Sequence, residues 1–167
     1  MRAKLKRWLR EGVVLLLIAA AAMLVMDQFR QPALPATFVS TPLQTLDGKS
    51  LSLAEMSQDR PLLVYVWATW CGVCRYTTPS VAKIAEEGGN VISVALRSGD
   101  DATLSNWLVR KHYAMPTVND ATGQLSRSWQ VQVTPTLMIV SKGEVKSVTT
   151  GFTSGWGMKL RLWWAGV

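Results

Sequence analysis

The two cysteines of this chain, Cys71 and Cys74, are three positions apart and are its only cysteines. They directly follow an apolar run, residues 62–68, that is typical of a buried strand. A helical pattern begins at Cys74, so the pair stands at a junction between a strand and a helix. Amides and the dipole at the start of a helix stabilise a thiolate there. The chain is therefore expected to form an α/β fold with a dithiol at one end of its sheet.

The hydrophobic pattern divides the rest of the chain into strands and helices. Strands are predicted at 43–46, 50–53, 62–68, 91–96, 136–140 and 144–149, and helices at 74–87, 101–113, 122–129 and 154–164. Asp47-Gly48-Lys49 indicates a hairpin turn between the first two strands. Five tryptophans at helical positions are expected to pack in the core or between helix and sheet: Trp107, Trp129, Trp156, Trp163 and Trp164. This order predicts a mixed sheet covered by helices on both faces.

A basic start and an apolar segment precede this domain. Residues 1–11 carry five of the 18 Lys and Arg side chains against one acidic side chain. Residues 12–29 are predicted to form a transmembrane anchor that leaves the basic segment in the cytoplasm. A cleaved secretory signal is the alternative interpretation, and it would also export the domain. The Pro-containing residues 30–36 are predicted to be a linker, and residues 37–167 a domain in the periplasm of a bacterial inner membrane.

The charge of the predicted domain argues against a nucleic-acid partner. Outside the basic start, 13 basic and 10 acidic residues leave a net charge of about +3. Neutralising a row of phosphates requires a larger and more concentrated positive charge. We therefore expect no nucleic-acid binding. No pattern in the sequence indicates an oligomer, so a monomer is expected.

Three features together resemble the thioredoxin-like family. They are the strand before Trp70-Cys71-Gly72-Val73-Cys74, the helix that contains Pro79, and Thr134-Pro135 at the start of a later strand. The hairpin before the first core strand and the insertion at 91–115 resemble the membrane-anchored, exported TlpA-like and ResA-like branch. Within that branch the chain most resembles thioredoxin-like proteins linked to suppression of copper sensitivity. The resemblance covers about residues 36–167 and implies a thioredoxin fold and a protein disulfide oxidoreductase.

The resemblance also implies roles for individual residues. Cys71 would be the nucleophile that forms a mixed disulfide with a substrate, and Cys74 would resolve it, so the two would form a redox-active disulfide. Substrate contacts are implied for Trp70, Gly72, Val73, Thr134 and Pro135, and the bond before Pro135 is expected to be cis. No cofactor is implied. The expected partners are protein thiols or disulfides and a DsbD-like membrane thiol-electron transporter that supplies electrons.

Three positions depart from the pattern of reducing thioredoxins. Val73 replaces the usual Pro between the cysteines, and Tyr65 stands where cytosolic thioredoxins carry a buried Asp that relays a proton. The ResA-like branch places a Glu after the next strand, where this chain has Asp100. Asp100 is therefore a candidate proton relay. The alternative is that it caps the helix that follows it.

Other uses of the two cysteines remain open at this stage. They could form a structural disulfide, although a bridge that closes so short a loop constrains the unfolded chain little. They could also form a Cu(I)-binding or delivery module, because thiolates are ligands that Cu(I) prefers. His112 is the only histidine and lies far away in sequence, so a third ligand is missing and no metal site is predicted. Arg75 could stabilise a thiolate or belong to a solvated helix face.

Overall fold

The computed structural model describes residues 8, 10–18, 21–22 and 34–167, and it divides the chain into two compact units, 1–31 and 32–167. In the first unit, residues 10–18 are helical. Among the described residues, no helix combines the length and the apolar character needed to cross a membrane. The predicted anchor, 12–29, and linker, 30–36, lie partly outside the described residues. Both therefore stay predictions.

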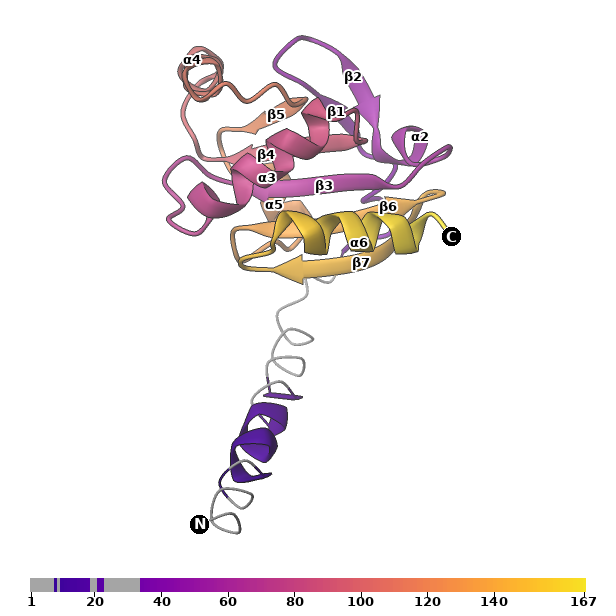
Figure 1. Cartoon of the computed structure of the whole chain (residues 1–167). Helices are drawn as coiled ribbons and strands as arrows, with labels where there is room; N and C mark the ends of the chain where they lie inside the picture. The colour runs from indigo at the N-terminus through magenta and orange to yellow at the C-terminus, as the bar shows by residue number, and fades with distance from the viewer. Residues whose placement is uncertain (1–7, 9, 19–20, 23–33) are drawn as a thin grey trace. The chain divides into compact units, whose positions relative to one another are not determined.

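A five-stranded mixed sheet forms the centre of the second unit (Figure 1). Its strands are β3 (Leu62–Trp67), β4 (Val91–Leu96), β5 (Thr117–Asp120), β6 (Thr136–Ser141) and β7 (Glu144–Thr150), in the order β5-β4-β3-β6-β7. The strands β3, β4 and β5 are parallel, whereas β6 and β7 run antiparallel to their neighbours. A separate two-stranded sheet, β1 (Pro42–Gln44) and β2 (Ser50–Ser52), confirms the predicted hairpin.

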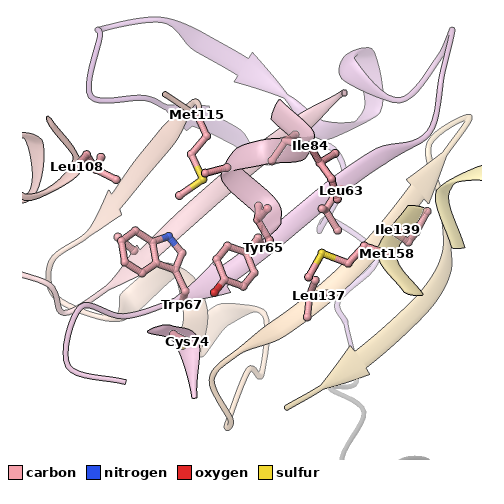
Figure 2. Packing of buried hydrophobic residues seen from close by; sticks show 14 of the residues in the cluster. Leu63, Tyr65, Trp67, Cys74, Ile84, Leu108, Met115, Leu137, Ile139 and Met158 are labelled. Atoms are coloured by element: carbon pink, nitrogen blue, oxygen red, sulfur yellow. The ribbon is translucent and has the colours of Figure 1, made fainter. Parts of the chain in front are cut away.

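The helices lie on both faces of this sheet, as predicted. They are α2 (Leu53–Met56), α3 (Cys74–Glu86), α4 (Asp101–Lys111), α5 (Gln124–Ser128) and α6 (Gly155–Ala165). Side chains alternate across the central strand β3, which is fully buried. On one face, Leu63, Tyr65 and Trp67 pack with residues of α3, α4 and α6 (Figure 2). On the other face, the intervening β3 residues pack with Phe38, Leu53 and Trp129.

Strand β5 was missed by the sequence analysis. It has only four residues, and Asn119 and Asp120 are poor strand formers. Parallel pairing with β4, including a 2.9 Å hydrogen bond between the hydroxyls of Ser93 and Thr117, holds it at the edge of the sheet. A tertiary contact therefore forms a strand that local sequence does not favour.

The expectation for three helical tryptophans was wrong. Trp156, Trp163 and Trp164 of α6 are 75%, 64% and 76% exposed. The inner face of α6 is occupied by the buried Met158, with Leu162 beside it, so the tryptophans lie on the outer face. By contrast, two others meet the expectation: Trp129 is buried, and Trp107 packs against the core.

Candidate redox site

Cys71 and Cys74 form a disulfide at the amino end of α3. Their Cα atoms are 5.2 Å apart. The backbone N–H of Cys74 donates to Cys71 Sγ, with 3.1 Å between nitrogen and sulfur. Cys71 is partly exposed, whereas Cys74 is buried. The outer sulfur is therefore the one that a protein substrate can reach, and a backbone amide is already directed at it to stabilise negative charge.

The loop before the pair is attached to the end of β4. The backbone N–H of Thr69 donates to Ser98 Oγ at 3.0 Å, and the indole N–H of Trp70 donates to Arg97 O at 3.0 Å. Trp70 is still 61% exposed, so its ring is held in place while one side faces solvent. Between the cysteines, Gly72 and Val73 are both exposed. Three of the predicted contact residues, Trp70, Gly72 and Val73, thus lie at one accessible end of the sheet, together with Cys71 itself.

Thr134 and Pro135 lie beside the outer cysteine. The Thr134–Pro135 peptide bond is cis, which confirms that expectation. Thr134 O is 3.6 Å from Cys71 Sγ, and Pro135 O accepts a hydrogen bond of 2.8 Å from the backbone N–H of Gly151. The structure therefore brings the cis-proline loop and the cysteine pair together. Contact of either loop with a substrate stays a prediction.

A hydrogen-bonded chain of buried groups lies beneath the pair. The Thr78 hydroxyl donates to Cys74 O at 2.7 Å, and it is 2.8 Å from the hydroxyl of Tyr65. Burial raises the pKa of Tyr65 well above its ordinary value. Tyr65 therefore stays protonated, and it does not reproduce the buried carboxylate of cytosolic thioredoxins. Figure 2 shows the rings of Tyr65 and Trp67 side by side, with Cys74 close to both.

A pocket of about 340 Å³ opens beside the pair and includes both cysteines in its wall. Trp107, Lys111 and Tyr113, all from the α4 region, line it together with Arg75 from α3. Burial raises the pKa of Tyr113, which keeps its hydroxyl neutral. No carboxylate is among the lining residues, so the fixed charge next to the inner sulfur is positive. Sequence reasoning missed Lys111 and Tyr113, because no local pattern connects the end of α4 with cysteines more than thirty residues earlier.

Asp100 occupies the N-cap position of α4. One of its carboxylate oxygens accepts a 2.7 Å hydrogen bond from the backbone N–H of Thr103. This hydrogen bond lowers the pKa of Asp100, and the side chain is exposed. A proton relay needs a carboxyl group that is readily protonated, whereas this one is stabilised in its charged form. The geometry favours the capping role over the relay, which stays an untested prediction.

The described residues contain no group of three or more His, Cys, Asp or Glu side chains placed to hold a metal ion. The arrangement of the pair instead suits thiol-disulfide exchange. It offers one reachable sulfur, one buried sulfur at bonding distance and a cis-proline loop beside them.

Comparisons with known proteins agree with this chemistry. The family model described as Redoxin matches residues 28–155. A thioredoxin-like protein of Haemophilus influenzae is 43% identical over 162 residues, which is 97% of both chains. The thiol:disulfide interchange protein DsbE of Pseudomonas fluorescens biotype C is 32% identical over 88% of this chain and 86% of its own. A secreted disulfide oxidoreductase of Mycobacterium tuberculosis shares the fold, with a TM-score of 0.64 and 18% identity over 75% of this chain and 96% of its own. The chain therefore belongs to the Redoxin family, and its Cys71–Cys74 pair is that of a thioredoxin-like disulfide oxidoreductase.

Proposed function

We propose that residues 12–29 anchor this oxidoreductase in a bacterial inner membrane and that its redox domain exchanges disulfides with proteins in the periplasm. The observation that carries the exchange reaction is the pairing of a partly exposed Cys71 with a buried Cys74 whose N–H is directed at the outer sulfur. The basic residues before position 12 support this orientation, because Lys and Arg are retained on the cytoplasmic side. The resemblance to the ResA-like branch favours reduction of the partner protein.

In that direction the reaction has two steps. The Cys71 thiolate attacks a disulfide of the partner protein, so a Cys71–partner disulfide forms and one partner sulfur leaves as a thiolate that takes up a proton. The Cys74 thiolate then attacks Cys71 Sγ, which releases the second partner thiol and leaves the Cys71–Cys74 disulfide seen here. A dithiol of a DsbD-like membrane transporter would supply the two electrons that restore the reduced pair.

Trapping tests the exchange reaction. In a Cys74→Ala variant, the mixed disulfide on Cys71 cannot be resolved, so covalent complexes with partner proteins are expected to accumulate in the periplasm. The matched control is Cys71→Ala, which keeps one cysteine but removes the reachable sulfur. Complexes no more abundant in Cys74→Ala than in the control would contradict disulfide exchange through Cys71.

The anchor and the link to copper need separate tests. After alkaline extraction of membranes, the full-length chain is expected to remain in the membrane fraction, whereas release of a shortened chain would show a cleaved signal. For copper, cells that lack the protein are expected to grow less well on copper salts and to be rescued by the wild type but not by Cys71→Ala. Equal growth of all three strains would contradict a role in copper tolerance.

A further inference from the structure

A second hollow adjoins the cysteine pocket at Trp70, which lines both. It has a volume of about 380 Å³, and its wall includes Trp70, Arg97, Arg127, Gln130, Val131 and Gln132. We call it the Trp70 groove. Trp70 lines both this groove and the pocket that contains the cysteines. A polypeptide bound at Cys71 that continues across Trp70 therefore enters the groove.

The groove carries two guanidinium groups. The Nε–H of Arg97 donates to Thr122 O at 3.2 Å, which leaves its terminal N–H groups for another partner. Gly123 makes room for this side chain, because a Cβ there would be 2.8 Å from Arg97 Nε. Arg127 is exposed, and neither arginine belongs to an ion pair found among the described residues.

No carboxylate among the lining residues balances this charge. Asp120 lies close in the sequence to the lining residue Gly123, but it is buried. Its two carboxylate oxygens accept hydrogen bonds from the backbone N–H groups of Leu125 and Ser126. This carboxylate therefore caps the amino end of α5. The groove also offers side-chain amides at Gln130 and Gln132, next to the apolar Val131 and Trp70.

We infer that the Trp70 groove binds an acidic segment of the partner protein, adjacent in the chain to the cysteine that exchanges with Cys71. Guanidinium groups hold carboxylates through paired hydrogen bonds, and the amides of Gln130 and Gln132 can bind the backbone of the same segment. Electrostatic attraction of this kind speeds association and selects partners. The inference rests on the proposed exchange function and adds a charge preference to it.

The test uses the oxidised full chain in detergent and three synthetic peptides. Each peptide has one cysteine, flanked by Glu, Gln or Lys residues, and the rate constant for its attack on the Cys71–Cys74 disulfide is measured. Each rate constant is divided by the rate constant for the reaction of the same peptide with a small-molecule disulfide. This division removes the effect of the flanking charges on the reactivity of the peptide thiol. The test variant is Arg97→Gln/Arg127→Gln. The control, Arg110→Gln/Lys142→Gln, removes the same charge outside the groove.

With the wild type and the control, the Glu peptide is expected to react about five- to tenfold faster than the Gln peptide, because two exposed ion pairs together contribute about this factor. In Arg97→Gln/Arg127→Gln the preference is expected to fall below about twofold, while the Lys peptide reacts at least as fast as with the wild type. High salt is expected to reduce the preference of the wild type as well.

The two proposals fail in different ways. Reaction without a preference for the Glu peptide, or a preference that survives in Arg97→Gln/Arg127→Gln, would overturn the groove and leave disulfide exchange intact. Failure of all three peptides to react with the wild type would overturn the exchange function, and the groove with it.

Discussion

The buried hydrogen bonds beneath the cysteine pair allow a stability prediction with worked magnitudes. Thr78 has one hydroxyl proton, which it donates to Cys74 O. The Tyr65 hydroxyl, 2.8 Å from Thr78 Oγ1, must therefore be the donor in that contact. Both side chains are buried, at 0% and 2% exposure, so solvent cannot readily replace a lost partner.

The perturbation is removal of each hydroxyl in turn. Thr78→Val keeps the shape of the side chain but leaves the Tyr65 hydroxyl unpaired, so it is expected to lower the free energy of unfolding by about 2 kcal/mol. Tyr65→Phe leaves Thr78 bonded to Cys74 O, so it should cost about 1 kcal/mol, the net contribution of one hydrogen bond. The double variant contains no unpaired hydroxyl, and its cost is expected to be about 1 kcal/mol less than the sum of the single costs.

Urea unfolding of the oxidised chain measures these differences, provided that the dependence of stability on urea is unchanged. The adjacent Thr77 supplies the control. It is also fully buried, but its hydroxyl has no hydrogen-bond partner among the described residues, so Thr77→Val should cost less than about 0.5 kcal/mol or stabilise the protein. The reasoning is refuted if Thr78→Val costs no more than Thr77→Val, or if the costs of Tyr65→Phe and Thr78→Val are additive.

Three further predictions concern Asp100 and Lys111. Asp100→Ala should lower the melting temperature at pH 7. Because the folded-state pKa of Asp100 is lowered, its contribution to stability is present above the unfolded value of about 3.9 and is lost as pH falls through the folded value. The melting temperatures of the two proteins should therefore converge once pH falls below that folded value, and a difference that stays constant would contradict this. In Asp100→Asn, which keeps an N-cap acceptor, an unchanged Cys74 titration would contradict the proton relay. Lys111→Gln is expected to slow the release of a partner from its mixed disulfide about threefold relative to Arg110→Gln, because of these two residues of α4 only Lys111 lines the pocket beside Cys74. Quenched-flow measures the release, and equal rates in the two variants would exclude this electrostatic role.

Local sequence signals predicted most of the fold and the centre of the site. The run 62–68 became β3 (Leu62–Trp67), because a central strand buried on both faces needs unbroken apolar residues. The pair at the start of α3 was predicted by the same strand-to-helix junction. In contrast, the exposure of Trp163 on α6 depends on which face meets the sheet, and helical spacing does not determine that when apolar residues occur on both faces.

The parts of the site that were missed come from segments far apart in the chain. Lys111 reaches the cysteine pocket from the end of α4, and Arg127 reaches the Trp70 groove from α5. Each is an exposed basic residue on a helix, which is an ordinary surface feature when only the sequence is considered. Their significance depends on the lack of a carboxylate in the same hollow, and that is a property of the folded arrangement.

The charged side chains that line the pocket beside Cys74 are cations, and no carboxylate is among them. Tyr65 cannot take the proton of Cys74, because burial keeps it protonated and its own proton is donated to Thr78. Arg75 and Lys111 line the pocket beside Cys74; they can stabilise a thiolate, but as cations they cannot accept its proton. Unless Asp100 acts as the relay predicted from the sequence, the proton leaves through the open pocket, to solvent or to the departing thiolate of the partner. Resolution should therefore slow as added salt screens the two cations, whereas proton transfer to a buried carboxylate would depend little on salt.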